Sequence, residues 1–229
     1  MQPETIQYPT IHWANMSARY VQTVLYQKSA INDRCAVMLT GGRSAERLMF
    51  SWAELPDFAQ LNNIDFFFGD ERCVSPEDEE SNFGLAMRTL FRFGVPTGCV
   101  VHRIKAEAGD KDLVAKLYEK LLPDRIDLLL LGVGEDGHIA SLFPGSSVLK
   151  ETRKIVPVIA PKPPAERLTI TPEVIGQSES ILVLATGEGK LASLKRVLCS
   201  SASAQQCPAK LVQHATWLID FDRPVLESP

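Results

Sequence analysis

The sequence predicts an α/β protein in which helices cover both faces of a mostly parallel β-sheet. Short apolar segments alternate along the chain with segments whose apolar residues recur at helical spacing. Several of the apolar segments contain almost no polar residue, which is typical of strands buried on both faces of a parallel sheet. Hydrophobic residues make up 45% of the 229 residues, enough for a substantial core, and we expect a single domain over residues 1–229.

The first third of the chain contains two apolar strands and two helices. Apolar spacing predicts a helix over His12–Ala30. Cys35–Leu39 is a short apolar strand, and the loop Thr-Gly-Gly-Arg-Ser separates it from a helix over about Ala45–Trp52. Ile64–Phe68 is a second apolar strand, and the polar sequence Gly-Asp-Glu-Arg follows it directly.

The middle third adds two strands and two helices. Ser81 and Asn82 are favoured N-cap residues, and apolar residues follow them at helical spacing, so a helix begins there. Cys99–Ile104 is predicted as a strand and Lys111–Leu122 as a helix. Ile126–Leu131 is apolar apart from one aspartate and is the clearest buried strand in the chain.

The last third contains shorter strands and one more helix. Ile155–Ile159 and Leu168–Thr171 are short strand candidates. Ile181–Ala185 is another buried strand, and a helix over about Lys190–Cys199 comes after the sequence Gly-Glu-Gly. Thr216–Ile219 is predicted as a final edge strand.

Charge and cysteine content narrow the classes of function. The formal net charge is −4 and no basic block is present, which argues against nucleic-acid binding. The five cysteines are scattered without a Cys-x-x-Cys pair, which is typical of reduced thiols in the cytoplasm. No apolar stretch approaches about 18 residues and the N-terminus lacks a signal-peptide pattern, so we expect a cytoplasmic protein without a membrane partner.

Four of the predicted strands end in polar turns that contain glycine. The turns are Thr40–Ser44, Gly69–Arg72, Gly132–His138 and Thr186–Lys190. Because the carboxyl ends of parallel strands lie at the same edge of a sheet, residues of these turns should converge there. The sequence therefore predicts an active or binding site at this edge.

The turn Thr40–Ser44 has the composition of a phosphate-binding loop. Its glycines allow close approach, and the backbone N–H groups at the start of the following helix favour an anion. The Walker A pattern is absent, so this is not a nucleotide-type P-loop. Arg167 and Lys190 are candidate counter-charges for the same phosphate.

His138 is the strongest candidate for a catalytic residue. It follows the most apolar strand and a turn with three glycines, and histidine is the side chain best suited to move protons near neutral pH. The same turn matches Gly-x-Gly-x-x-Gly, but no acidic residue ends a strand about 20 residues later, so dinucleotide binding is disfavoured. The Gly-x-Ser-x-Gly elbow and the His-Glu-x-x-His motif are absent, so neither a serine hydrolase nor a metal site is supported.

Residues 134–144, Gly-Glu-Asp-Gly-His-Ile-Ala-Ser-Leu-Phe-Pro, resemble the signature of the 6-phosphogluconolactonase family. The family's pattern reads roughly Gly-x-Asp-Gly-His-x-Ala-Ser-Leu-Phe-Pro. The resemblance extends from about residue 35 to residue 220, and Ala45 and Glu135 stand where the family commonly has proline. The other similar segments, in order, are TGGRSAERL, FFFGDERCVSPEDEESNFGLAM, RLTIT, GEGKLASLKRVL and CPAKLVQHATWLID.

The resemblance implies a three-layer α/β/α, Rossmann-like fold of the type found in glucosamine-6-phosphate deaminases and ribose-5-phosphate isomerases. It also implies hydrolysis of 6-phospho-D-glucono-1,5-lactone to 6-phosphogluconate, the second step of the oxidative pentose phosphate pathway. No metal or coenzyme is expected for this reaction, the expected partner is the sugar-phosphate lactone, and the expected oligomeric state is a monomer.

Specific roles follow from the chemistry of the reaction. We expect His138 to be the general base, with Asp136 either orienting its imidazole or binding a sugar hydroxyl. Arg72 is expected to bind the lactone oxygens or to hold the site together through Asp70. Backbone N–H groups around Gly134–Gly137, which include those of Gly134 and Gly137, are expected to stabilise the oxyanion. The predicted phosphate site comprises Gly41, Gly42, Arg43, Ser44, Arg167 and Lys190.

Two alternatives come from other classes of function. A sugar-phosphate isomerase or deaminase would need a carboxylate base, and Asp70 has the matching position. However, Glu71 and Arg72 differ from the Asp-Glu-Tyr of the deaminases, and Ser141–Pro144 replaces their Phe-Asn-Glu-Pro. A non-catalytic sugar-phosphate sensor would keep the phosphate loop, but it would not need His138 and Asp136.

Overall fold

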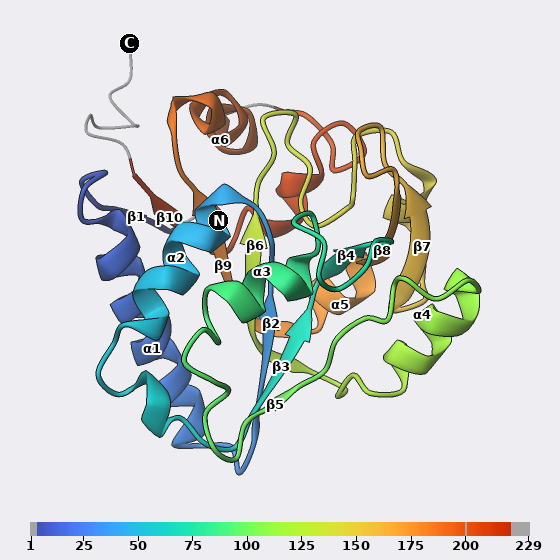
Figure 1. Ribbon diagram of the computed structural model, residues 1–229. Helices are drawn as coiled ribbons and strands as arrows, with labels where there is room; N and C mark the ends of the chain where they lie inside the picture. The colour runs from blue at the N-terminus through green and yellow to red at the C-terminus, as the bar shows by residue number, and fades with distance from the viewer. Residues whose placement is uncertain (1–3, 200, 221–229) are drawn as a thin grey trace.

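The centre of the molecule is a seven-stranded sheet in which every neighbouring pair of strands is parallel (Figure 1). The computed structural model describes residues 4–199 and 201–220. From one edge to the other the strands are β1 (Glu4–Gln7), β10 (Thr216–Ile219), β9 (Ser178–Ala185), β6 (Ile126–Gly132), β2 (Cys35–Leu39), β3 (Ile64–Phe68) and β5 (Val100–Val101).

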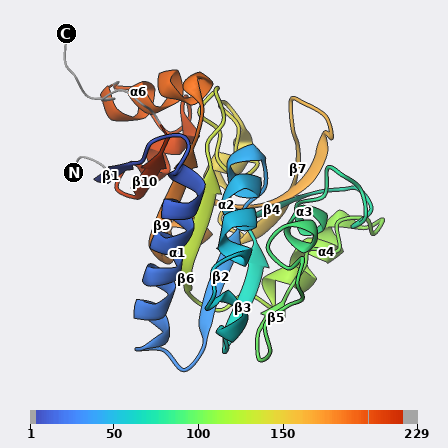
Figure 2. The same cartoon turned by 60° about the vertical axis from the view of Figure 1, so that its left-hand side comes forward.

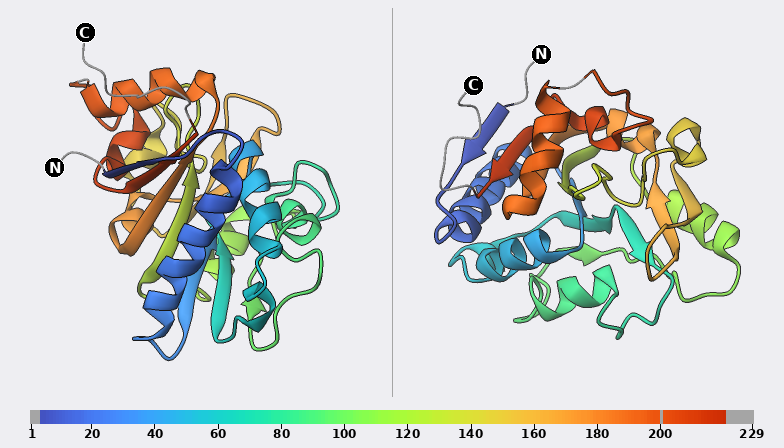
Figure 3. Two further views of the ribbon diagram at one scale, coloured as in Figure 1. Left: turned by 90° about the vertical axis from the view of Figure 1, so that its left-hand side faces the viewer. Right: turned by 90° about the horizontal axis from the view of Figure 1, so that it is seen from above.

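Helices cover both faces of this sheet and give three layers (Figures 2 and 3). Helices α1, α2 and α3 pack side by side over one face, and α5 and η4 lie on the other. No helix in the described part is long and apolar enough to cross a membrane. The α-helices are α1 (Trp13–Ser29), α2 (Arg43–Ala53), α3 (Asn82–Arg88), α4 (Lys111–Glu119), α5 (Pro172–Gly176) and α6 (Leu191–Cys199). The 3₁₀ turns are η1 (Phe58–Gln60), η2 (Ser147–Lys150), η3 (Glu188–Lys190) and η4 (Pro208–Val212).

A second, antiparallel sheet of three strands extends the molecule beyond β3. Its order is β4 (Asp70–Arg72), β8 (Glu166–Ile170) and β7 (Ile155–Ile159), and α4 packs against β7. The strand β4 was not predicted, because Asp70–Arg72 has no apolar residue. The short sheet matters for function because it places Arg72 directly opposite Arg167.

The predicted strands are largely confirmed, with two corrections. Thr216–Ile219 is not an edge strand, because Glu4–Gln7 pairs with its outer side. The strand predicted over Cys99–Ile104 is reduced to two residues, Val100 and Val101. Beyond them the hydroxyl of Tyr118 accepts the Phe68 N–H at 2.7 Å and so takes the place of a continuing strand.

The strand order places the site at a reversal of the chain's direction across the sheet. From β2 the chain proceeds outward through β3 to β5, and it then returns to the other side of β2 and proceeds through β6 to β9 and β10. Ligands of open α/β sheets bind outside the carboxyl ends of the strands at such a switch point. Here the switch lies between β2 and β6, where Thr40 Oγ1 accepts the N–H of Gly132 at 3.3 Å.

Candidate active site

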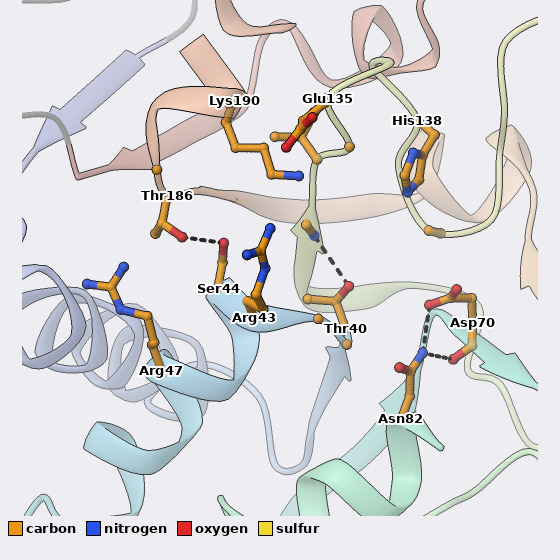
Figure 4. A pocket seen from close by; sticks show the side chains of 18 of the residues that line it. Thr40, Arg43, Ser44, Arg47, Asp70, Asn82, Glu135, His138, Thr186 and Lys190 are labelled. Carbon is orange, nitrogen blue, oxygen red and sulfur yellow. Dashed lines mark hydrogen bonds between the residues drawn. The ribbon is translucent and has the colours of Figure 1, made fainter. Parts of the chain in front are cut away.

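A cavity of about 520 Å³ lies at the carboxyl edge of the sheet, between the turns that follow β2, β3, β6 and β9 (Figure 4). The four turns expected to converge therefore do so. Of the twelve predicted site residues, all but Asp136 and Gly137 line this cavity. The ten that line it are Gly41, Gly42, Arg43, Ser44, Asp70, Arg72, Gly134, His138, Arg167 and Lys190.

The cavity wall is locally positive although the chain is negative overall. Among the described residues that line it, five carry a basic side chain and three a carboxylate, against a formal net charge of −4 for the whole chain. Such a local excess of cations attracts an anionic ligand. The basic residues are Arg43, Arg47, Arg72, Arg167 and Lys190, and the acidic ones are Asp70, Glu135 and Glu188.

His138 is held by its neighbour Asp136 in an orientation suited to proton transfer. Its Nδ1 forms a hydrogen bond with Oδ1 of Asp136, and its ring lies against Phe143 with 4.6 Å between the ring centroids. The bond at Nδ1 leaves Nε2 as the ring nitrogen that can exchange a proton with a ligand. Because Asp136 itself does not line the cavity, the geometry favours the orienting role over a contact with substrate.

The carboxylate of Asp136 remains ionised well into the acid range. Burial raises its pKa, but the hydrogen bond and the charge of His138 lower it more, and Lys162 at 3.9 Å lowers it further. The net effect is a pKa well below the usual value for aspartate. A permanent negative charge beside Nδ1 stabilises the imidazolium that forms when the ring accepts a proton.

The turn that carries His138 is closed by its own backbone hydrogen bonds. The N–H of Gly134 donates to the His138 carbonyl at 2.8 Å, and the N–H of Gly137 donates to the Gly134 carbonyl at 3.0 Å. Gly137 has a φ of 85° and Ala140 a φ of 46°, both in the left-handed region that few residues adopt. The N–H groups of Gly134 and Gly137 are therefore engaged within the turn, so these two of the donors expected around Gly134–Gly137 are not free to stabilise an oxyanion.

The amino-terminal end of α2 points its first turn into the cavity. The helix begins at Arg43, two residues earlier than predicted, so that Arg43 and Ser44 belong to its first turn. Gly42 precedes it with a φ of 90°, which only glycine adopts without strain. A Cβ on Gly41 would lie 1.8 Å from Oδ1 of Asn82, so the backbone there passes directly over a buried side chain. These features make the end of α2 a suitable anion site.

Lys190 is a half-buried ammonium on the opposite side of the cavity from α2. Burial lowers its pKa, and the charge of Arg43 lowers it further, while Glu135 acts in the opposite direction. Figure 4 shows the side chains of Lys190, Glu135 and Arg43 directed into the same space. The wall formed by Lys190 and Arg43 therefore favours an anionic ligand.

Arg72 and Arg167 form a second pair of cations beside Asp70. Arg167 is only 5% exposed, its Nε donates to the Pro164 carbonyl at 2.8 Å, and burial together with Arg72 lowers its pKa. Arg72 bonds to the carbonyl and the carboxylate of Glu80, not to Asp70. The expected link between Arg72 and Asp70 is therefore wrong. The Nε of Arg72 is buried without a hydrogen-bond partner in the described part of the chain.

Asp70 is a fully engaged buried carboxylate. Ser141 Oγ donates to its Oδ2 at 2.7 Å, and Asn82 Nδ2 donates to its Oδ1 at 3.0 Å. Glu71, next in the chain, points away from the cavity and accepts the N–H groups of Asn82 and Phe83, so that it caps the start of α3. Both carboxylates therefore organise the loop after β3.

Eleven of the residues that line the cavity were absent from the predicted site, and four of them carry polar side chains that bear on its chemistry. These four are Arg47, Asn82, Glu135 and Thr186. Arg47 lies one helical turn after Arg43, and this spacing was the only signal in the sequence that placed it on the same helix face. Within the described residues, no cluster of three or more His, Cys, Asp or Glu side chains is arranged to hold a metal ion.

Comparison with known proteins gives matches over most of the chain. The family described as glucosamine-6-phosphate isomerases/6-phosphogluconolactonase matches residues 12–219. A 6-phosphogluconolactonase of Rattus norvegicus is 40% identical over 166 residues, which cover 67% of this chain and 64%, just under two thirds, of the rat protein. A 6-phosphogluconolactonase of Bos taurus is 39% identical over 225 residues, which cover 90% of this chain and 87% of the bovine protein.

Solved structures of similar fold support the expected architecture. A 6-phosphogluconolactonase from Thermotoga maritima superimposes with a TM-score of 0.84 at 24% identity, covering 96% of this chain and all of that one (100%). A monomeric glucosamine-6-phosphate deaminase superimposes with a TM-score of 0.80 at 22% identity, covering 95% and 97% of the two chains. The predicted α/β fold, shared with the deaminases, is thus confirmed. With a family match over residues 12–219, the chain belongs to the family of glucosamine-6-phosphate isomerases and 6-phosphogluconolactonases.

Proposed function

We propose that this protein hydrolyses 6-phospho-D-glucono-1,5-lactone to 6-phosphogluconate. The observation that carries the proposal is the His138–Asp136 pair, which faces a cavity rich in cations at the carboxyl edge of the sheet. The relatives named above as 6-phosphogluconolactonases lend it support, since two of them are about 40% identical to this chain. The reaction needs a base and an anion site, and the cavity offers both.

In the proposed mechanism His138 acts first as a base and then as an acid. Its Nε2 removes a proton from water while the water oxygen bonds to C1 of the lactone, and the carbonyl oxygen becomes an oxyanion. When the carbonyl re-forms, the bond between C1 and the ring oxygen breaks. The proton on Nε2 then moves to the departing ring oxygen, which becomes the C5 hydroxyl, and the imidazole is neutral again.

Arg72 is the proposed donor to the oxyanion. Its Nε is buried, has no partner among the described residues and belongs to a side chain that lines the cavity. A guanidinium held in the cavity wall beside the place where charge develops on the substrate stabilises the transition state more than the ground state. This assignment replaces the backbone N–H groups of Gly134 and Gly137.

The phosphate is proposed to bind between α2 and Lys190. The N–H groups at the start of α2 and the hydroxyl of Ser44 would contact its oxygens, and Lys190 and Arg43 would balance its charge. Arg167 lies nearer Arg72 and Asp70, and we assign it to the polar groups of the sugar ring or to the phosphate. Such remote contacts position C1 against His138.

The deaminase alternative is disfavoured by the surroundings of Asp70. A base that abstracts a carbon-bound proton must present a free carboxylate oxygen to the substrate. Both oxygens of Asp70 accept hydrogen bonds, from Ser141 and Asn82. Phe143 lies against the His138 ring, in the segment where the deaminases carry a catalytic glutamate.

The direct test follows loss of the lactone. Glucose-6-phosphate dehydrogenase generates 6-phosphogluconolactone, and its disappearance is recorded with and without this protein, and with EDTA. We expect the protein to accelerate the loss and EDTA to have no effect. A rate equal to that in buffer would refute the proposed function.

We propose a cytoplasmic monomer whose partner is the small sugar-phosphate substrate and not a nucleic acid. Light scattering on the purified protein would report the mass against 25.3 kDa for one chain. Fractionation of the source cells would test the location.

Gly134 cannot carry a side chain without moving the catalytic pair. A Cβ at this position would lie 1.9 Å from Nδ1 of His138 and 2.4 Å from Oδ1 of Asp136. We expect Gly134→Ala to lower kcat by ~10²-fold, because displacing a reacting group by about 1 Å has effects of this size. Gly109→Ala is the matched control, since nothing lies within 4 Å of its added Cβ. Equal kcat values for the two variants would contradict the role of this turn.

Glu135 is expected to weaken phosphate binding. It lines the cavity, its Oε1 lies 2.5 Å from where a Cβ on Gly189 would be, and its charge acts on Lys190. Glu135→Gln should lower KM by up to about fivefold and leave kcat unchanged. This limit corresponds to the energy of a solvent-exposed charge pair, which is about 1 kcal/mol or less. Glu173→Gln, an equal change in net charge outside the cavity, is the control. A KM that rises in Glu135→Gln would mean that the carboxylate binds substrate.

A further inference from the structure

Asp220 is a buried carboxylate for which the proposed mechanism has no role. It follows β10 directly and is only 3% exposed. Its Oδ1 accepts the backbone N–H of Gly187 at 2.6 Å, and its Oδ2 accepts Nη1 of Arg47 at 2.8 Å. One side chain therefore joins the end of β10 to the β9–α6 loop and to α2.

The segments that Asp220 joins are the two that carry the proposed phosphate contacts. Gly187 has a φ of 84°, and its carbonyl accepts the N–H of Lys190 at 3.0 Å, so the position of Gly187 governs the turn that carries Lys190. On the other side of Gly187, Thr186 Oγ1 shares a hydrogen bond of 2.6 Å with Ser44 Oγ (Figure 4). The loop is thus attached to α2 at one residue and to Asp220 at the next.

Arg47 explains why a carboxylate suits this position better than an amide. Two donors, one of them a guanidinium, converge on the side chain of Asp220, and only a carboxylate accepts both through separate oxygens. Arg47 also donates to the Thr10 carbonyl at 3.0 Å and lies over the Trp13 ring at 5.2 Å. Asp220 therefore keeps one cation of the cavity wall in a fixed place.

We propose that Asp220 is a positioning residue for substrate phosphate. It fixes the β9–α6 loop against α2 and so sets the separation between Lys190 and the amino-terminal end of α2. In this proposal Asp220 does not contact the substrate, and its carboxylate is paired with the guanidinium of Arg47. The inference rests on the proposed function, because it takes the phosphate of a sugar-phosphate lactone as the ligand of these two segments.

The test compares Asp220 with a buried aspartate at the other end of the sheet. Asp127 is 6% exposed and also accepts one backbone N–H, from Ala36 at 2.8 Å, and one side-chain donor, Asn32 at 2.9 Å. It lies at the start of β6, at the edge away from the cavity. Asp127→Ala therefore removes the same kinds of bond without affecting the phosphate segments.

Four readouts separate positioning from a general loss of structure: Tm, KM, the inhibition constant of inorganic phosphate and kcat. We expect Asp220→Ala and Asp127→Ala to lower Tm by similar amounts. Only Asp220→Ala should raise KM for the lactone and the inhibition constant of inorganic phosphate, each about tenfold, with kcat changed less than twofold. Asp220→Asn keeps one acceptor, so it should show a smaller rise in both constants, and it serves as the test variant if the alanine variant does not fold.

The outcomes distinguish this inference from the proposed function. Unchanged KM in both Asp220 variants, or an equal rise in KM for Asp127→Ala, would overturn the positioning role. A loss of kcat at constant KM would also overturn it. If the wild-type protein does not hydrolyse the lactone, the proposed function fails instead, and calorimetric binding of inorganic phosphate to wild type and Asp220→Ala then decides the positioning role alone.

Discussion

Replacing His138 by alanine should lower kcat by ~10²–10⁴-fold, the usual contribution of a general acid–base residue. The lactone is an activated ester, so water still attacks it slowly in the variant, and the residual rate should approach that in buffer. KM should change little, because in the proposed mechanism the imidazole contacts the attacking water and the phosphate binds elsewhere. Initial rates at several lactone concentrations, corrected for spontaneous hydrolysis, measure both constants.

The chain offers a matched control for this variant. His102 also pairs with an aspartate, since its Nε2 lies 2.8 Å from Oδ1 of Asp65, but it does not line the cavity. His102→Ala removes an equivalent histidine–aspartate pair and should leave kcat near the wild-type value. A His138→Ala enzyme that retains more than about a tenth of the wild-type kcat would contradict the base assignment.

The pH dependence of kcat is a second readout of the same prediction. Because Asp136 stays ionised far into the acid range, its own titration should not appear in the profile near neutral pH. The neutral imidazole of His138 is the form that can accept a proton. We therefore expect any fall of kcat that the wild type shows on mild acidification to be absent from the residual rate of His138→Ala.

The sequence was sufficient to predict the elements whose residues are uniform in character. Apart from Asp127, Ile126–Leu131 and Cys35–Leu39 are apolar on both faces, which favours burial between two helical layers. Once these strands were parallel, their carboxyl-terminal turns had to meet at one edge. This is why ten of the twelve predicted site residues line the cavity.

The features that sequence reasoning missed depend on contacts between distant segments. The antiparallel pairing of Asp70–Arg72 with Arg167–Thr169 joins segments almost 100 residues apart, and no local pattern signals it. The replacement of a strand partner by the Tyr118 hydroxyl is equally non-local. The N–H groups of Gly134 and Gly137 are a local example of the same difficulty. The composition of this segment predicts a flexible turn, but it does not predict which N–H groups form hydrogen bonds within that turn.

Lys190→Ala is expected to raise KM for the phosphorylated lactone by ~10–100-fold. This is the effect of losing one charge-assisted hydrogen bond to phosphate, which contributes about 1.5–3 kcal/mol. The ammonium is half-buried, and burial lowers its pKa, so in the free enzyme it lacks a partner charge strong enough to offset its desolvation. A phosphate dianion supplies that charge. The contact is remote from C1, so kcat should fall much less than kcat/KM.

The controls for Lys190 separate its charge from its position. Lys195→Ala removes an exposed ammonium from the next helix and should leave KM unchanged. Lys190→Arg keeps the charge on a longer side chain and should recover part of the affinity. Because burial depresses the pKa of Lys190, inorganic phosphate should bind the wild type less tightly as the solution becomes alkaline and this ammonium deprotonates, and that dependence should disappear in Lys190→Ala. If the inhibition constant of phosphate followed the same pH curve in both proteins, the phosphate would bind elsewhere in the cavity. Arg167 and Arg72 would then be the next cations to replace.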